Sequence, residues 1–401
     1  MTMTTVMLSK TSALDASTPL SIKAQTDYQT KVIRSLEEFE TCRKAWTELM
    51  NAADIQNLTM SHGWLVNWLK AFPALQLAVV VVIDKNGQWV AGAPLKISRL
   101  QKGVGHRALR HLHFIGTHPT IFDWMRIAIS PQIEETIAAD AMATALKAEP
   151  WDVMALVFND AKSPLENLQQ AFQKLSIQSQ IEESMILPYI PLPETAEDYT
   201  QQRGKKTNTR VRHCYNRIKK QLDKTPELVF QPADAEKPLC DFIAGHTHYW
   251  GEQGFKSIFV RFPQLCQFYQ DMLYYSQTEA AADDPKFVFT TLNIDNRPVS
   301  YHFGFMQGNG YLCHVTHYDD DYKFYSPGLV HMDKAIFNTI DNHGSRFEFG
   351  RGDEPYKKIW TQQHYPLWTM VAYKNPVARL LWQSDFAIKT LLKKPIGFLE
   401  P

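Results

Sequence analysis

The stretch Gly310-Tyr-Leu-Cys-His-Val-Thr-His-Tyr318 is rich in aromatic and β-branched residues and predicts a β-strand. After a loop, residues 328–342 carry apolar side chains at helical spacing and predict a helix. The stretch Arg346–Phe349, in which two phenylalanines alternate with charged residues, predicts a second strand directly after it. A strand, a loop, a helix and a strand in this order predict a domain of the mixed α/β class.

The same order of elements occurs in both halves of the chain. Before Gly310, the runs 286–294 and 299–306 predict a hairpin around a turn at Asp295–Pro298. About 200 residues earlier, the runs 77–83 and 88–97 flank an Asn-Gly turn, a strong hairpin signal. A strand, a helix and a strand are then predicted in turn, at 122–130, 133–147 and 151–158. We therefore predict one structural unit used twice.

Two amphipathic helices are predicted ahead of the first hairpin. Residues 34–50 and 61–72 carry apolar side chains three or four positions apart. Ser61 has the side chain that an N-cap requires.

The length and charge balance predict two domains. The chain has 401 residues, of which 44% are hydrophobic, and its 42 basic residues balance its 42 acidic ones. At ~150 residues per domain, the chain is long enough for two domains. Its zero net charge excludes a protein whose whole surface binds nucleic acid through positive charge. We expect a disordered leader at 1–27, domains at 28–194 and 195–375, and a helical tail at 376–401, with the domain boundary in the proline-rich stretch 188–197.

Cysteine usage and hydropathy indicate a cytoplasmic protein. The five cysteines are scattered and show no C-x-x-C spacing, which argues against a disulfide framework and a thiolate metal site. The longest apolar run, 77–83, is the length of a strand and too short to cross a bilayer, so we expect no transmembrane segment.

Three stretches of the second half resemble a known family. They are Tyr325-Ser-Pro-Gly328, Arg346-Phe-Glu-Phe-Gly-Arg-Gly-Asp-Glu-Pro-Tyr-Lys-Lys-Ile-Trp360 and His248-Tyr-Trp-Gly-Glu-Gln-Gly-Phe255. The combination resembles the GNAT-related acyltransferases of the CelD/BcsL type, which are distantly similar to the Fem aminoacyltransferases. The resemblance implies tandem GNAT-like domains, each a mixed sheet in which two central strands splay apart.

The resemblance also implies how a donor binds. Acyl-CoA, a co-substrate and not a tightly bound cofactor, would enter between the splayed strands, with its pyrophosphate on the N-terminus of the following helix. The usual glycine-rich phosphate loop is absent, and Ser326-Pro-Gly328 stands in its place. Asp319 to Asp321 lie nearby and would repel an anion unless they point away. The residues expected to contact the donor are His317, Tyr325, Ser326, Gly328 and Leu329.

The stretch Gly350-Arg-Gly-Asp-Glu-Pro-Tyr-Lys357 is the predicted catalytic segment, because α/β proteins build sites where strands end. Asp353 or Glu354 would act as general base and Tyr356 would protonate the departing thiolate. Arg351 would orient a carboxylate or phosphate. The alternative is a tight turn closed by an Arg–Asp pair. The residues expected to bind the acceptor are Tyr249, Trp250, Lys357 and Trp360, although aromatic side chains also serve as core.

Two further features leave alternatives open. His314 and His317 are three positions apart and would face opposite sides of a strand, which makes them a poor metal site. The pairs 111/113 and 246/248 could each face one side of a strand, but neither has a clustered third ligand, so we expect no metal. Nine basic residues against one acidic residue lie in a helical pattern at 203–224. This segment is either a solvated face or a site for CoA phosphates, an acyl carrier protein, an anionic polysaccharide or lipid, or tRNA. The nine are Arg203, Lys205, Lys206, Arg210, Arg212, Arg217, Lys219, Lys220 and Lys224.

The sequence and the resemblance together predict an acyltransferase. It would move an acyl group from acyl-CoA to an amine or hydroxyl of a sugar, lipid or cell-envelope precursor, with a link to exopolysaccharide or cellulose production. The C-terminal copy would hold the chemistry and the N-terminal copy would be a scaffold or acceptor platform. Two alternatives are Fem-like aminoacyl transfer from tRNA and a non-catalytic scaffold. We expect no DNA partner, and no P-loop, G-x-S-x-G or HExxH motif occurs.

Overall fold

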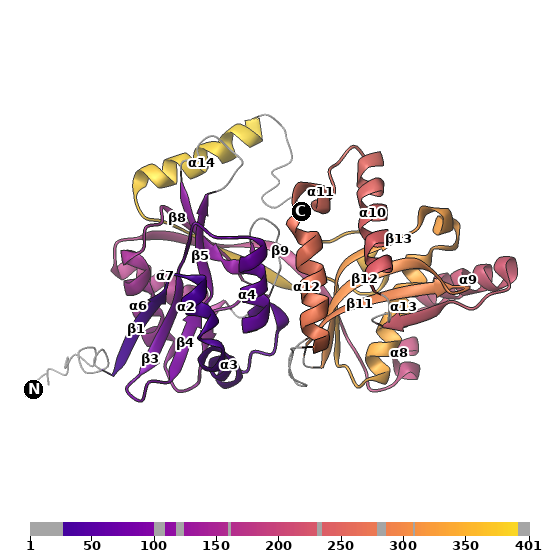
Figure 1. Ribbon diagram of the computed structural model, residues 1–401, viewed down its shortest axis with the longest axis horizontal. Helices are drawn as coiled ribbons and strands as arrows, with labels where there is room; N and C mark the ends of the chain where they lie inside the picture. The colour runs from indigo at the N-terminus through magenta and orange to yellow at the C-terminus, as the bar shows by residue number, and fades with distance from the viewer. Residues whose placement is uncertain are drawn as a thin grey trace, which may run out of the picture.

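The computed structural model describes residues 27–99, 109–117, 124–158, 162–230, 235–278, 286–307 and 309–391. The predicted leader, apart from Asp27, and the end of the predicted tail, 392–401, lie outside this part of the chain. The described residues form two lobes that lie side by side (Figure 1).

The first lobe contains the following elements in chain order: β1 (Tyr28–Ile33), α2 (Leu36–Glu40), α3 (Arg43–Ala52), the short 3-10 helix η1 (Leu58–Met60), α4 (His62–Ala71), β2 (Gln76–Leu77), β3 (Val79–Asp84), β4 (Trp89–Ala93), β5 (Leu95–Arg99), β6 (Arg110–Phe114), η2 (Ile115–Thr117), β7 (Ala128–Ile129), α6 (Glu135–Ala148), β8 (Val153–Phe158) and α7 (Ser163–Lys174). The long strand β9 (Gln178–Pro191) leads into the second lobe.

The second lobe contains α8 (Ala196–Gln202), α9 (Lys205–Leu222), β10 (Glu227–Phe230), α10 (Glu236–Glu252), α11 (Ile258–Arg261), α12 (Gln264–Thr278), β11 (Lys286–Ile294), β12 (Arg297–Gln307), β13 (Gly310–Tyr318), η3 (Asp320–Tyr325), α13 (Pro327–Asp341), β14 (Arg346–Glu348), η4 (Lys357–Ile359) and β15 (His364–Tyr373). The chain then returns to the first lobe, where α14 (Pro376–Leu391) packs on β8 and β15 (Figure 1).

The order of elements is the predicted one in the second lobe, where the antiparallel hairpin β11–β12 is followed by β13, α13 and the strand β14, which returns parallel to β13. The first lobe differs from the prediction, because the hairpin β3–β4 is followed by three strands, β5, β6 and β7, before α6. The returning strand β8 pairs in parallel with β6, whereas β7 pairs with β4. The hairpin turn of the second lobe holds Asp295 and Asn296 at φ 55° and 62°, the left-handed values that a two-residue hairpin turn requires. Ser61 caps α4 as predicted, because its hydroxyl accepts a hydrogen bond from the main-chain nitrogen of Trp64. The fold class is therefore mixed α/β with a GNAT-like order of elements used twice.

Both lobes share one continuous sheet, because their last strands are exchanged. The sheet runs β10-β11-β12-β13-β14-β9-β15-β8-β6-β5-β2, and a second sheet runs β1-β3-β4-β7. Strand β9, which follows the first lobe in sequence, pairs with β14 of the second. Strand β15, which follows the second lobe, pairs with β8 of the first. The two exchanged strands also pair with each other along their length.

Three local predictions need correction. The predicted helix 34–50 is two helices, because Thr41 and Cys42 form a turn between α2 and α3. The predicted strand 122–130 is reduced to Ala128–Ile129 within the described residues, and its first two residues lie outside them. His246 and His248 lie on α10 and not on a strand.

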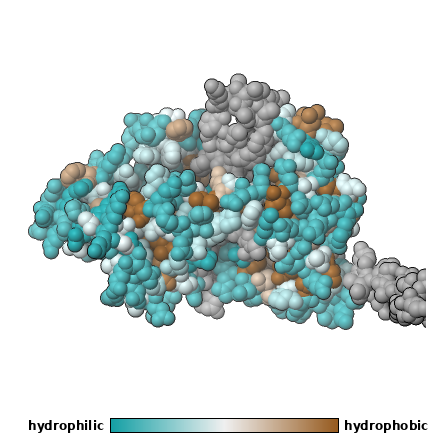
Figure 2. Space-filling view, turned by 180° about the vertical axis from the view of Figure 1, so that it is seen from behind, coloured by the Kyte–Doolittle hydropathy of each residue, from teal (hydrophilic) through white to brown (hydrophobic). Residues whose placement is uncertain are grey.

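Apolar side chains are concentrated in the core and polar side chains on the surface. A large apolar cluster spans both lobes, from Trp46 and Trp64 in the first to Phe268 and Phe303 in the second. Viewed from behind, the surface is mainly hydrophilic with scattered hydrophobic side chains (Figure 2). Among the described residues, no helix is both long and apolar enough to cross a membrane.

Candidate functional site

The strands β13 and β14 separate partway along the sheet. They pair in parallel through three positions, the last of which joins Leu312 to Glu348. Beyond that point β13 continues to Tyr318 and pairs only with β12 within the described part of the chain. The edge of β13 from Cys313 onward therefore offers main-chain hydrogen-bonding groups to something other than a strand.

A β-bulge lies where the two strands separate. Phe303 of β12 pairs with Val315 and Gly304 pairs with Cys313, so His314 is an extra residue in β13. His314 stacks on Phe305 with ring centroids 5.4 Å apart. Burial, together with the charge of Arg351, lowers the pKa of His314 to about 3, so its imidazole is neutral near pH 7. The corresponding strand β6 of the first lobe pairs with β5 without a bulge.

The N-terminus of α13 lies just beyond the end of β13. Ser326 has the left-handed φ of 53° and starts the helix, with Pro327 in its first turn. A side chain built on Gly328 would meet only the ring of Tyr318, at 3.5 Å, so the first turn has open space beside it. Unpaired N–H groups and the helix dipole make such a terminus favourable for an anion.

The charged groups around this helix end are partly neutralised. Asp319, one of the three aspartates expected to repel an anion, forms an ion pair with Arg297 at 2.8 Å and caps η3. Arg217 of α9 donates a hydrogen bond to the carbonyl of Phe324 and stacks on its ring. Asp320 and Asp321 are exposed.

Helix α10 covers the end of β13. Gly245 approaches His317 so closely that a side chain at Gly245 would meet the imidazole at 2.2 Å. Tyr249 and Trp250 are half-buried on the same helix, and the Trp250 indole donates a hydrogen bond to Nε2 of His246. Burial lowers the pKa of His317. His317 and Tyr249 thus lie at the end of β13 nearest α13.

The Gly350–Lys357 loop is closed by a buried ammonium group. Lys357 is 3% exposed. Its Nζ donates hydrogen bonds to the carbonyls of Gly350, at 3.1 Å, and Arg351, at 2.5 Å, and lies 2.8 Å from the Glu354 carboxylate. Lys357 thus holds the loop together, a contact that competes with the predicted role in binding an acceptor.

The two carboxylates proposed as bases point toward lysines. Asp353 is exposed and pairs with Lys358 at 3.0 Å, which lowers the pKa of its carboxyl. Glu354 is half exposed and pairs with Lys357. The Arg–Asp pair of the alternative interpretation is thus replaced by two Lys–carboxylate pairs.

The aromatic residues of the loop differ in accessibility. Trp360 is buried in the cluster between α13 and the sheet, as expected of a core residue. Tyr356 is 39% exposed, although desolvation of its phenol and the neighbouring Cys313 and Glu354 raise its pKa. Cys313 is the first residue of β13 past the separation from β14, so Tyr356 lies beside that point.

One group of side chains was not predicted from the sequence. The carboxylate of Glu348, buried at the separation of the two strands, accepts hydrogen bonds from Nε1 of Trp124 at 2.8 Å and the hydroxyl of Tyr365 at 2.6 Å. Trp124 comes from the first lobe and is separated from Glu348 by 224 positions. Because the two residues are so far apart in sequence, no local sequence pattern could have predicted this contact.

The predicted residues thus form two groups along β13. His317, Tyr249 and the Ser326–Leu329 segment lie toward α13. Tyr356 and Arg351 lie beside Cys313 and His314, where the strands separate. Both groups lie along β13. The side chains of Trp360 and Lys357, which were also predicted to bind a substrate, are buried in the protein.

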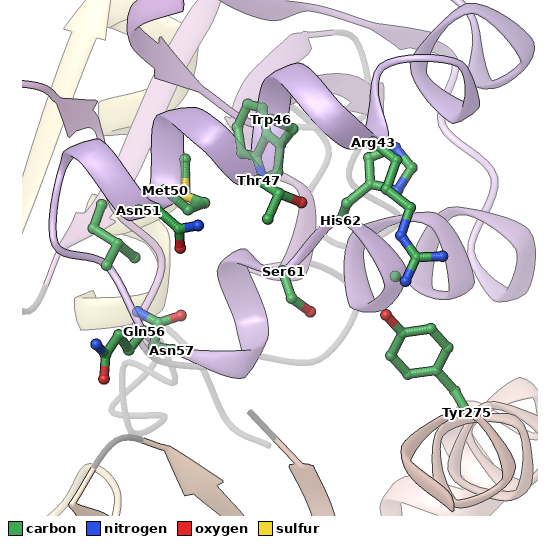
Figure 3. A pocket seen from close by; sticks show the side chains of 12 residues that line it. Arg43, Trp46, Thr47, Met50, Asn51, Gln56, Asn57, Ser61, His62 and Tyr275 are labelled. Atoms are coloured by element: carbon green, nitrogen blue, oxygen red, sulfur yellow. The ribbon is translucent and has the colours of Figure 1, made fainter. Parts of the chain in front are cut away.

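A separate small cavity lies elsewhere, between α3, α4 and α12. It has a volume of about 70 Å³ and contains none of the predicted site residues. Arg43, Asn57 and His62 line it from the first lobe, and Tyr275 points into it from α12 (Figure 3). Its size suits a few water molecules and not a coenzyme.

No cluster of His, Cys, Asp and Glu suited to a metal ion occurs among the described residues. The histidines 302 and 331 stack face to face at 3.5 Å inside the second lobe, where His331 bonds to Thr290 and Ser300. These rings are core residues.

Comparisons with known proteins agree with this geometry. A family model described as acetyltransferase (GNAT) domain matches residues 209–358. A search of curated proteins found no match.

Solved structures resemble the chain over most of its length. FemX is 10% identical over 89% of this chain and 99% of its own, with a TM-score of 0.56. A conserved protein of unknown function from Bacteroides thetaiotaomicron VPI-5482 is 11% identical over 86% and 99%, with a TM-score of 0.52. A tandem GNAT protein from the clavulanic acid biosynthesis pathway is 10% identical over 87% and 99%, with a TM-score of 0.46. At such identities the first two likenesses concern the fold alone. The strands that separate, β13 and β14, lie within residues 209–358, the stretch that is similar to an acetyltransferase (GNAT) domain.

Proposed function

We propose that this protein is an acyltransferase that moves an acyl group from acyl-CoA to an amine or hydroxyl of a sugar, a lipid or another cell-envelope precursor. The observation that carries the proposal is the separation of β13 from β14 beside the open N-terminus of α13. The match of residues 209–358 to an acetyltransferase family supports it.

The donor would lie along the free edge of β13. Its amide groups would pair with main-chain groups between Cys313 and Tyr318, and its pyrophosphate would lie on the first turn of α13 at Ser326, Gly328 and Leu329. Tyr325 and His317 would flank it. The ion pair of Asp319 with Arg297 reduces the repulsion that an anion would meet there.

The reaction would be direct attack on the thioester. The acceptor nitrogen or oxygen forms a bond to the carbonyl carbon, the carbon–sulfur bond breaks, and the acceptor proton passes to a base. Tyr356 would protonate the departing thiolate; its raised pKa keeps the phenol protonated at neutral pH but makes it a weak proton donor. Arg351, beside His314, would orient an anionic group of either substrate.

The base remains a choice between Asp353 and Glu354. Pairing with Lys358 lowers the pKa of Asp353 and weakens it as a proton acceptor. Glu354 would have to leave Lys357 to act. Replacing each in turn, as Asp353→Asn and Glu354→Gln, tests the pair: full turnover in both variants would remove both from the mechanism.

The acceptor would approach Tyr249 and Trp250 on α10. These two side chains are half-buried at the end of β13, whereas Lys357 and Trp360 would shape the site from beneath it.

Calorimetric titration with acetyl-CoA and longer acyl-CoAs tests the donor. We expect binding to the wild-type protein and its loss in Gly328→Asp, because a carboxylate at the first turn of α13 would repel the pyrophosphate. The matched control is Gly87→Asp, which adds the same charge at the hairpin turn of the first lobe, where nothing lies within 4 Å. Absence of binding to the wild type would refute acyl-CoA as donor, and equal binding to Gly328→Asp would refute this location.

A second candidate donor is aminoacyl-tRNA. This donor is favoured by the basic residues exposed on one face of α9. The opposite face of α9 packs against α13. Arg203 and Arg217 make internal contacts, but the remaining seven basic residues of the 203–224 segment are exposed. Binding of tRNA at low salt that weakens steeply as salt rises would support this donor. An acyl carrier protein or another anionic ligand would also be attracted to this face.

The acceptor and the link to exopolysaccharide or cellulose production are best tested in cells. Untargeted mass spectrometry of wild-type and deletion strains should reveal a product that lacks one acyl increment in the deletion strain. A protein that neither binds acyl-CoA nor releases its thiol would instead fit the scaffold alternative.

A further inference from the structure

The first lobe places one side chain at the separation of β13 and β14. Trp124 has a left-handed φ of 73°, which is strained for a residue other than glycine. Its carbonyl accepts hydrogen bonds from Nδ2 of Asn57, the N-cap of η1, at 2.7 Å and from the hydroxyl of Thr59, within η1, at 3.2 Å. The first lobe thus fixes the main chain of Trp124 in this conformation, and strained backbone of this kind gathers at functional sites.

The indole of Trp124 binds one oxygen of a buried carboxylate and leaves the other accessible to a further donor. Oε2 of Glu348 accepts from Trp124 and from Tyr365. Oε1 has Arg346 at 3.4 Å, on a side chain that is half exposed. Because a carboxylate oxygen can accept two hydrogen bonds, Oε1 retains capacity for another donor.

Glu348 faces away from α13. Phe347 and Phe349 pack with Met332 and Ile336 of α13 in one cluster. Because successive side chains of a strand point to opposite faces, Glu348 lies on the other face of the sheet, where Trp124 and Tyr365 contact it. The proposed donor-phosphate site and Glu348 are therefore on opposite faces.

A small space lies beside Gly350, at the point where β13 and β14 separate. This glycine has a φ of 70°, and a side chain built on it would meet the Cys313 carbonyl and the Trp124 ring at 3.9 Å, an ordinary van der Waals distance. Gly350 thus lies between the free edge of β13 and the indole.

We propose that Glu348, oriented by Trp124 and Tyr365, accepts a hydrogen bond from the amine or hydroxyl of the acceptor on the sheet face opposite α13. Trp124 is a positioning residue in this arrangement, and through it the first lobe forms part of the acceptor site. The inference rests on the proposed acyltransferase function and adds the face from which the acceptor enters.

The test measures donor binding and acceptor use separately in the full-length protein. Acetyl-CoA binding is measured by calorimetry, and transfer to ethanolamine, a small probe that carries both an amine and a hydroxyl, is measured as release of the CoA thiol. Glu348→Gln should lower kcat/KM for ethanolamine by ~10-fold or more, the effect of losing a hydrogen bond to a charged group, while the dissociation constant of acetyl-CoA stays within ~2-fold.

Trp124→Phe keeps an aromatic ring but removes the indole donor. We expect it, like Tyr365→Phe, to raise KM for ethanolamine ~3- to 10-fold with a smaller change in kcat, because Glu348 is less well oriented. The matched control is Trp151→Phe, which also removes one buried indole hydrogen bond, to the carbonyl of Leu146. It should leave both parameters unchanged, and thermal melting confirms that each variant folds.

The outcomes separate the two proposals. A wild-type protein that binds neither acetyl-CoA nor longer acyl-CoAs refutes the proposed function and with it this inference. Binding without thiol release refutes the assignment of this face to an amine or hydroxyl. Normal KM for ethanolamine in Glu348→Gln and Trp124→Phe refutes the inference alone and leaves the acyltransferase proposal standing.

Discussion

The buried ammonium of Lys357 donates a hydrogen bond to the main-chain carbonyl of Gly350 at 3.1 Å. The same Nζ also bonds to the carbonyl of Arg351 and pairs with Glu354. A side chain seven positions away thus determines the conformation of the loop that follows β14.

Replacing Lys357 should therefore destabilise the protein. Lys357→Met removes the ammonium and leaves main-chain carbonyls without their charged donor, so we expect the free energy of unfolding in urea to fall by ~2 kcal/mol. Lys358→Met is the control, because Lys358 pairs with Asp353 at the surface and such pairs contribute ~0–1 kcal/mol. Equal stability of the two variants would contradict this role of Lys357.

A buried ion pair fixes the junction between α8 and α9 to α13. Arg203, which follows α8, and Asp333 of α13 form it with side chains 7% and 6% exposed, and Tyr215 of α9 donates a second hydrogen bond to Asp333 at 3.1 Å. Asp333→Asn leaves the guanidinium buried without a counter-charge and should cost ~3 kcal/mol or more of unfolding free energy. Asp295→Asn, which breaks the exposed pair with Lys224, should cost no more than ~1 kcal/mol. Similar losses in both would argue against a special role for the buried pair.

The stability of the second lobe should fall in mild acid. Burial lowers the pKa of His302 to about 3, and burial with the neighbouring His302 lowers the pKa of His331 from its ordinary 6.5. The unfolded chain therefore binds protons that the folded one excludes, and stability present above pH 6.5 is lost as the pH falls from 6.5 toward 3. Each such histidine contributes a slope of up to ~1.4 kcal/mol per pH unit.

Urea unfolding between pH 7.5 and 4.5 measures this slope. His302→Phe keeps a ring against His331 and removes one titrating group, so its slope should be shallower than that of the wild type. His213→Phe, a substitution at an exposed position of α9, should leave the slope unchanged. A slope that His302→Phe does not alter would rule out this histidine as a source.

A methyl group at Gly350 should impair transfer more than stability. Gly350→Ala places this group between the Cys313 carbonyl and the Trp124 ring and strains a φ of 70°, at a cost of ~1–2 kcal/mol. Gly87→Ala meets the same strain at φ 82° in a hairpin turn and should cost as much. Acetyl-CoA turnover should fall only in Gly350→Ala; unchanged turnover would show that substrates do not approach Gly350.

The local signals in the sequence were sufficient for the order of elements in the second lobe but not for the division of 88–97 into β4 and β5, for β6, or for the long-range pairing of strands. Alternation, turn residues and the Ser61 cap depend on neighbouring positions, so the hairpins, α4 and α13 could be predicted. The break between α2 and α3 was missed because apolar spacing continues across Thr41 and Cys42. The exchange of β9 and β15 joins residues almost 200 positions apart, such as Gln178 and Tyr373, and no local pattern reports it.

The candidate site divides in the same way. The helix start at Ser326 and the loop at Gly350 have glycine and proline signatures that can be read locally. Glu348 is a single acidic residue within an apolar strand, and its meaning depends on Trp124 in the other lobe. The bulge at His314 is likewise a property of pairing and not of composition.

The strand exchange has a consequence for synthesis on the ribosome. Strand β15 follows the whole second lobe in sequence, yet it supplies the neighbour of β8 in the lobe that is made first. The nascent first lobe must therefore wait with an open sheet edge until the second lobe has been translated, and open edges invite pairing with other chains. Dividing the gene between the lobes should thus yield two fragments that aggregate apart and fold when co-expressed.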